Sequence, residues 1–303
     1  MSFLDTLCQM LVILFAIALG YLAHRLGYLN SETDQRLSKV ILNITMPAMI
    51  VGTVLTGDTL PDLAEILAVL KVAAVFYLLE LAFALAAPRV LGGTPGQKGV
   101  WRFSLLFANV VYIGYPVAEA LFGPGALFYA VILALPFNLL SYTLGPMMLV
   151  GAGRFRWRQA VTPCAVAALI GLFLALTRLR LPAIAGECLS FVGGVTVPLS
   201  LLVVGSLLAG LPIGRVFRAP RLWALSALRL LVIPAALFFI LRAMGTEPML
   251  LGIAVIEIAM PVAINGSMLS LEYGGDTECM AQAILLTTAA SIITIPLIAA
   301  LLL

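Results

Sequence analysis

Histidine and charged residues are scarce in this chain of 303 residues, which has one histidine and only 10% Asp, Glu, Lys and Arg. His24 stands beside Arg25, so a zinc site or a Ser-His-Asp arrangement lacks the necessary ligands and bases. Cysteine is also sparse and has no metal-ligand spacing, which favours buried free thiols that pack as small hydrophobes. The four are Cys8, Cys164, Cys188 and Cys279. No cofactor, metal site or catalytic residue is predicted.

Basic clusters are missing as well. The net charge is +3 and the Lys and Arg residues are spread over short loops, so nucleic acid is not an expected partner. By contrast, 63% of the residues are hydrophobic, far more than a soluble domain of this size carries. The first residues lack a basic region and a small-residue cleavage site, and we expect a retained first span rather than a signal peptide.

Apolar runs of about 20 residues, the length that crosses a bilayer, recur along the chain. Turn-forming and charged residues separate these runs. The sequence therefore predicts an all-α polytopic membrane protein with ten transmembrane helices. We place them at 3–24, 37–57, 63–87, 100–122, 125–150, 160–178, 184–210, 221–243, 248–271 and 279–302.

Basic residues favour one side of the membrane. The loops after the first, third, fifth and seventh spans hold twelve: Arg25, Arg36, Lys39, Arg89, Lys98, Arg102, Arg154, Arg156, Arg158, Arg215, Arg218 and Arg221. The loops after the second, fourth, sixth and eighth hold three: Arg178, Arg180 and Arg242. Cytoplasmic loops are enriched in Lys and Arg, so the loops with twelve basic residues are predicted to be cytoplasmic. Both termini are then predicted to lie on the outer, periplasmic side of the cytoplasmic (inner) membrane.

Division of the ten spans into five and five, 1–153 and 154–303, reverses the orientation of the second half, which is inverted-repeat topology. Irregular residues recur in step with this division. Proline falls in the second and fourth span of each half, at Pro47, Pro116, Pro198 and Pro261. This spacing supports the repeat.

Two of these spans carry residues that interrupt a membrane helix, at 109–116 and 260–267. A matched pair of interrupted spans is the best sequence indicator of a transporter's midplane site. The alternative is two kinked helices whose Asn side chains bond to neighbours and whose Tyr side chains pack. Our candidate substrate-binding residues are Asn109, Tyr112, Gly114, Tyr115, Pro116, Pro261, Asn265, Gly266 and Asn43.

A broken helix exposes N–H groups on one half and carbonyl groups on the other. The N-terminal ends suit an anion and the carbonyl ends suit a cation. If the spans cross at their breaks, two N-termini meet, and a carboxylate can bind there without an arginine. Asn109 and Asn265 would orient it, Tyr112 or Tyr115 would stack on or bond to the rest of the ligand, and the glycines would permit close backbone approach.

Glu257 lies one turn before Pro261 in an otherwise apolar segment. Ionisable residues inside spans are functional candidates by default. Glu257 is a candidate carrier of a coupling proton or cation. The alternative is a structural pair between Glu257 and Arg229 of the eighth span.

The chain resembles the auxin efflux carrier family, which includes the plant PIN-formed exporters and bacterial relatives. The resemblance rests on Asn109-x-x-x-x-Gly114-x-Pro116, Met260-Pro261, Leu271-Glu272-Tyr273-Gly274-Gly275-Asp276, Thr294-Ile295-Pro296-Leu297, Leu42-Asn43 with Met46-Pro47, and Pro198-Leu199 with Gly205. It implies inverted five-helix repeats with helices 4 and 9 broken and crossing at the substrate site. It also implies a scaffold of helices 1, 2, 6 and 7, often a dimer interface, and a moving core of helices 3–5 and 8–10. Asn109 would contact the substrate carboxylate. The long loop of many plant members between spans 5 and 6 is missing, so their regulation and auxin transport are not implied.

The predicted function is secondary transport of a small organic anion, a carboxylate, by elevator-type movement of the core. The alternative within transport is a symporter or antiporter with a sodium ion or proton bound near Glu257. A membrane enzyme would need a carboxylate, histidine or nucleophile motif that the sequence does not offer. A receptor or structural membrane protein would not need two matched helix breaks.

Overall fold

The computed structural model describes residues 3–56, 63–123, 125–151, 163–177, 179, 182–210 and 219–302, and this part of the chain is helical, without β-strands. The elements are α1 (Phe3–Arg25), α2 (Ser31–Val40), η1 (Ile41–Thr45), α3 (Met46–Thr56), α4 (Leu63–Leu91), α5 (Pro95–Leu106), η2 (Val110–Gly114), α6 (Tyr115–Phe122), α7 (Ala126–Leu133), α8 (Leu135–Val150), α10 (Pro163–Thr177), α11 (Ala183–Gly193), α12 (Thr196–Ala209), α13 (Pro220–Ala227), η4 (Leu228–Val232), α14 (Ile233–Ala243), α15 (Pro248–Ile258), α16 (Asn265–Tyr273) and α17 (Thr277–Leu302). The all-α prediction is confirmed for these residues.

Helices occupy every predicted span in the described ranges. Among the described residues, five helical stretches are long and apolar enough to cross a membrane: Ser31–Thr56, Leu63–Leu91, Ala183–Ala209, Pro220–Ala243 and Thr277–Leu302. Shorter apolar helices accompany them: Leu11–Arg25, Val110–Phe122, Ala126–Phe137 and Pro248–Ile258. The count of ten and the inverted repeat stay predictions, and the boundary between the repeats at 153 and 154 lies outside the described residues.

In the described part of the chain, three single π-helical turns, η1, η2 and η4, directly precede an α-helix, and each ends two residues before a proline: Pro47, Pro116 and Pro234. A proline inside a helix lacks an N–H and clashes with the carbonyl of the preceding turn. The wider π turn gives that carbonyl room. Pro116 therefore widens its helix rather than breaking it, and the break lies further toward the N-terminus, at residues 107–109.

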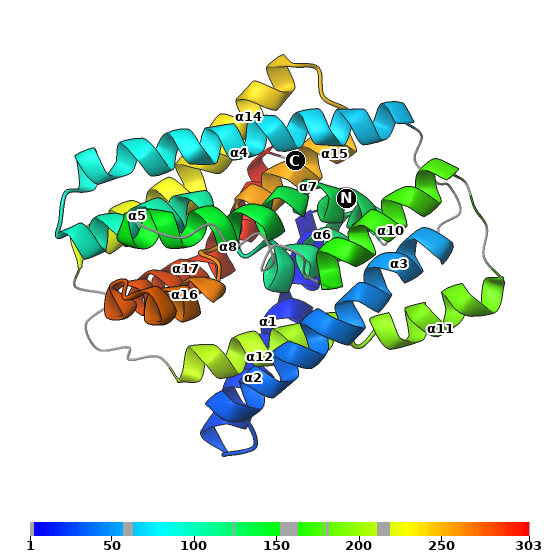
Figure 1. Ribbon diagram of the computed structural model, residues 1–303, viewed down its shortest axis with the longest axis horizontal. Coiled ribbons are helices and arrows are strands. Elements are labelled where there is room, and N and C mark those ends of the chain that lie inside the picture. Colours follow the sequence, from blue (N-terminus) through cyan, green and yellow to red (C-terminus); the bar gives the residue numbers. More distant parts are fainter. Residues whose placement is uncertain are drawn as a thin grey trace.

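The helices pack in two groups (Figure 1). In one, α1 packs on α12, α3 on α10 and α11, and α2 on α12; in Figure 1 these helices lie below and to the right. In the other, α5 lies between α4 and α8, α14 packs on α15, and α17 packs on α13 and α16; these lie above and to the left. The groups touch where α1 meets α6 and α17, and where α3 meets α7.

Close backbone approach holds α1 against α12. A Cβ atom on Gly20 would collide with the carbonyl oxygen of Leu202, and one on Gly205 would collide with that of Ile17. Small residues permit this approach, which is how membrane helices gain van der Waals packing where lipid supplies no hydrophobic drive. Gly205, part of the family resemblance, therefore has a packing role.

Candidate functional site

Two helix breaks meet in the interior of the structure. The first separates α5 from η2 at residues 107–109, and the second separates α15 from α16 at residues 259–264. Ala108 and Val262 form an antiparallel β-bridge across them. We call this meeting of the two breaks the crossing.

Main-chain hydrogen bonds hold the crossing together. The Asn109 N–H donates to the Pro261 carbonyl oxygen at 2.8 Å, and the Ala263 N–H donates to the Phe107 carbonyl oxygen at 3.0 Å. Buried backbone groups that lose their helical partners must find others. Each break therefore supplies hydrogen-bond partners for backbone groups of the other, and the two interrupted segments stabilise one another.

Asn109 caps the helix that follows the first break. Its Oδ1 accepts a hydrogen bond from the Tyr112 N–H at 3.3 Å, the usual role of Asn before a helical start. The side chain is 3% exposed, and its Nδ2 has no hydrogen-bond partner among the described residues. A buried amide donor without a partner is costly, so this group is suited to a ligand acceptor.

The second break supplies a matching amide. Asn265 begins α16 half-buried, and its Oδ1 has no hydrogen-bond partner in the described part of the chain. Next to it, the space beside buried Gly266 is filled by protein: a Cβ there would lie 2.6 Å from Phe103 Cε1 and 2.9 Å from Met280 Sδ. Gly266 thus makes room for side-chain packing in this conformation.

The remaining predicted residues differ in their surroundings. Tyr115 and Pro116 are buried in the first turn of α6, and Tyr112 is half-buried. Asn43 is exposed, and its Nδ2 donates to the Lys39 carbonyl oxygen within the same helix at 2.6 Å. Unlike Asn109, its amide group therefore already has a partner.

Glu257 points at Gly114. A Cβ on Gly114 would lie 2.6 Å from Glu257 Oε2 and 2.9 Å from Oε1, so the glycine is required for the carboxyl group to fit. Glu257 is 1% exposed, and neither oxygen has a hydrogen-bond partner among the residues described. A carboxyl group without a hydrogen-bond partner is thus packed between α15 and η2, beside the crossing.

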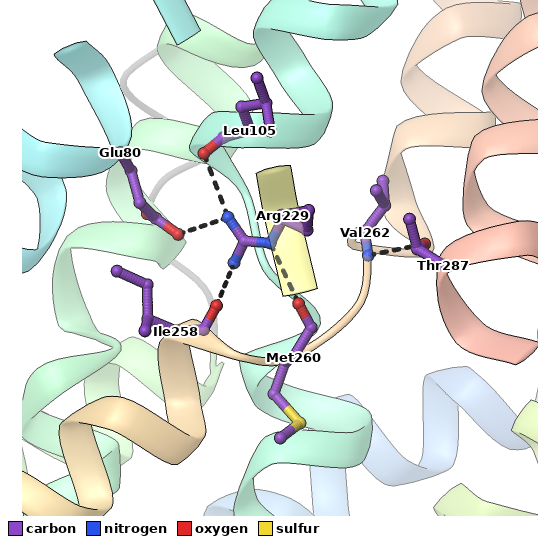
Figure 2. Close-up of polar contacts among 7 residues, drawn as sticks. All are labelled: Glu80, Leu105, Arg229, Ile258, Met260, Val262 and Thr287. Atoms are coloured by element: carbon purple, nitrogen blue, oxygen red, sulfur yellow. Dashed lines mark hydrogen bonds and ion pairs between the residues drawn. The ribbon is translucent and has the colours of Figure 1, made fainter. Parts of the chain in front are cut away.

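Arg229 of η4 reaches into the crossing from another helix and is fully buried (Figure 2). Its Nη1 lies 2.7 Å from Glu80 Oε1, forming an ion pair, and also donates to the Leu105 carbonyl oxygen at 3.1 Å. Its Nη2 donates to the Ile258 carbonyl oxygen at 3.1 Å and its Nε to that of Met260 at 3.0 Å. One guanidinium group therefore joins α4 to the C-terminal ends of both interrupted helices.

The interpretation that Glu257 pairs with Arg229 is wrong, because Arg229 pairs with Glu80. Glu80 lies within the third predicted span, 63–87, and Arg229 within the eighth, 221–243. Two opposite charges within apolar spans were the available signal, since buried charges in membranes are almost always paired. Among the described residues, no three His, Cys, Asp or Glu side chains are grouped so that they could hold a metal ion.

The same sequence pattern recurs in known proteins. The family model described as "Membrane transport protein" matches residues 5–154 and 147–299. The chain belongs to this family. The resemblance to auxin efflux carriers is thereby confirmed, and this family member is a multi-pass membrane protein.

Similar proteins in the family cover nearly the whole chain. An "Uncharacterized transporter" of Methanothermobacter thermautotrophicus is 26% identical, over 98% of this chain and 98% of its own length. One of the same description from Methanocaldococcus jannaschii is 23% identical, over 95% and 96%. A "Putative malonate transporter" of Rhizobium meliloti is 25% identical, over 92% of this chain and 90% of its own. The names of all three describe transport.

Proposed function

We propose that this protein is a secondary carrier of a small organic anion, a carboxylate, across the cytoplasmic membrane, with the substrate bound at the crossing. The observation that carries the proposal is the Asn109 Nδ2 donor, which is buried at the first break without a partner. A carboxylate oxygen is the acceptor that such a donor lacks. Malonate, the compound in the name of the Rhizobium meliloti relative, is a small dicarboxylate of this kind.

The helix ends at the crossing favour the same charge. η2 begins at Val110 and α16 at Asn265, each directly after its break. The N-terminal ends of helices carry partial positive charge and unsatisfied N–H groups. Two such helix ends beside Asn109 would stabilise a bound anion, so no free arginine is needed there.

The packing supports an elevator-type mechanism. We assign the group of α1, α2, α3, α10, α11 and α12 to the scaffold and the helices around the crossing to the moving core, because α1 and α2 pack on α12, and α10 and α11 pack on α3. The family model matches two segments, 5–154 and 147–299, which overlap at the predicted boundary of the inverted repeats. In this proposal the scaffold also forms a homodimer, and both termini face outward.

A cation-coupled symporter or antiporter is the second candidate. It is favoured by Glu257, whose buried carboxyl group has no hydrogen-bond partner among the described residues. A proton or a sodium ion bound there would neutralise the group. In this second candidate, binding of the proton or sodium ion at Glu257, rather than binding of the carboxylate, controls the movement of the core.

A thermal-stability screen of the purified protein tests the proposal. The ligands are malonate, other small carboxylates, amines and sugars, with and without sodium. A ligand that binds only the folded state at a hundred times its dissociation constant stabilises it by about 2.7 kcal/mol. We expect stabilisation by one class of carboxylates. Stabilisation by sodium alone, lost in Glu257→Gln, would favour the cation-coupled candidate.

The Asn109→Ser variant locates the anion. Serine caps helices about as well as asparagine, so the folded state is expected to persist, but the amide donor is lost. The carboxylate should therefore no longer raise the melting temperature. Ser104→Ala is the matched control, because Ser104 is buried on α5 and its Oγ has no partner among the described residues. An equal carboxylate response in Asn109→Ser and wild type would remove Asn109 from the site.

A further inference from the structure

The oxygen atoms around Arg229 belong to one carboxylate and to main-chain carbonyl groups at or just after two helix ends. α5 ends at Leu106 and α15 at Ile258, and the last carbonyl groups of a helix have no partners within it. These ends carry partial negative charge. With the Glu80 carboxylate they make an oxygen-only set, and transporters with broken helices hold sodium ions or protons at such carbonyl ends.

The guanidinium group of Arg229 occupies this position. Its hydrogen bonds run to one carboxylate oxygen and three main-chain carbonyl oxygens, at 2.7 to 3.1 Å (Figure 2). Arginine presents five N–H donors in a rigid plane and stays charged at any physiological pH. It therefore satisfies several fixed oxygens at once, as a bound cation would, but it cannot dissociate.

We propose that Arg229 is a built-in counter-ion, which fills the cation site formed by the ends of α5 and α15 and removes the need for an inorganic cation there. Arg229 is a positioning residue in this role, because it fixes the carbonyl ends of α5 and α15, and the breaks that follow these two helices form the crossing. The charge travels with the protein, so no ion enters or leaves at this position during a transport cycle.

Removal of the side chain with chemical replacement tests this role. Arg229→Ala should lower the melting temperature on the order of 10 °C, as expected when one partner of a buried ion pair is lost. Free guanidinium at about 10 mM should recover about 4 °C if its dissociation constant is near a tenth of that concentration. Urea has the same planar shape without the charge, and it should recover nothing.

The controls use an exposed ion pair and the wild type. Arg36 bonds Glu32 at 2.6 Å, with side chains 78% and 74% exposed, so Arg36→Ala should change the melting temperature little and should not respond to guanidinium. Wild type should not respond either. A folded Arg229→Ala protein that guanidinium leaves unchanged, or that urea restores equally, overturns the proposal.

Two further comparisons, both against Arg229→Met, apply if Arg229→Ala does not fold. Arg229→Lys keeps the charge and some of the donors, and it should be more stable than Arg229→Met. The double variant Glu80→Gln/Arg229→Met loses both charges, so it should be more stable than Arg229→Met and respond less to guanidinium. The opposite order in either comparison contradicts a counter-ion role.

These measurements are made without any carboxylate, so they are independent of the proposed substrate. If guanidinium rescues Arg229→Ala but the protein binds no carboxylate, the counter-ion role is supported and the anion carrier is refuted. If the wild type binds a carboxylate but guanidinium does not rescue Arg229→Ala, the anion carrier is supported and the counter-ion role is refuted.

Discussion

The contact between Gly114 and Glu257 makes a specific prediction about stability. A Cβ on Gly114 would lie 2.6 Å from Oε2 and 2.9 Å from Oε1 of Glu257, whereas ordinary contacts begin at 3.4 Å. The carboxyl group of a Gly114→Ala variant must therefore move by ~0.8 Å, the difference between 3.4 and 2.6 Å. Glu257 is 1% exposed, so its side chain has little room to move.

The magnitude follows from two opposing effects. Gly114 has α-helical angles, φ −60° and ψ −53°, so alanine is unstrained there and gains up to about 1 kcal/mol of helix propensity. Overpacking of an enclosed site costs about 1–3 kcal/mol. We expect a net loss of about 1–2 kcal/mol, which corresponds to a fall in melting temperature of roughly 2–8 °C.

A double-mutant cycle isolates the contact. In a Glu257→Ala background the carboxyl group is gone, so Gly114→Ala should become neutral or stabilising, with a coupling energy of about 1–3 kcal/mol. Glu257→Gln is the matched control, because it keeps the shape of the side chain, and Gly114→Ala should remain destabilising there. The melting temperature in detergent measures all of the variants. An equal effect of Gly114→Ala in the wild-type and Glu257→Ala backgrounds would refute this reasoning.

Two other predictions concern packing and topology. Gly205→Ala should lower the free energy of unfolding by about 3 kcal/mol or more, because its Cβ would meet a main-chain carbonyl of α1 that cannot move aside. Gly125→Ala is its control, since nothing lies within 4 Å of that position, and equal stability of the two variants would contradict the close packing. For topology, Tyr28 (76% exposed) and Met244 (40% exposed) are each replaced by cysteine in a cysteine-free background. Tyr28 is predicted to face the cytoplasm and Met244 the outside, so a membrane-impermeant thiol reagent should label intact cells only at position 244. Reaction at Tyr28 instead would reverse the predicted orientation.

Apolar runs and the turn-forming residues between them predicted where helices lie in the described ranges. The apolar runs predicted from the sequence correspond to helices in the described ranges, because a membrane helix must satisfy its backbone internally and its side chains must match lipid. The sequence also predicted interruptions at 109–116 and 260–267, which overlap the observed breaks at 107–109 and 259–264, because Asn, Gly and Pro weaken a helix locally. These are local properties, so they can be read from neighbouring residues. The family membership also follows from the sequence alone.

Only the tertiary structure decided which groups meet. The sequence offered Glu257 as a partner for Arg229, but the ion pair forms with Glu80, 149 positions away in the chain, because the rotation and height of packed helices determine which side chains face one another. The site of the first break was decided in the same way. The π turn accommodates Pro116, and the helix opens at 107–109, where main-chain hydrogen bonds to the second break replace those within the helix. Gly114 could be recognised as a weak point, but that it admits a buried carboxyl group depends on a contact between α15 and η2 that no local pattern encodes.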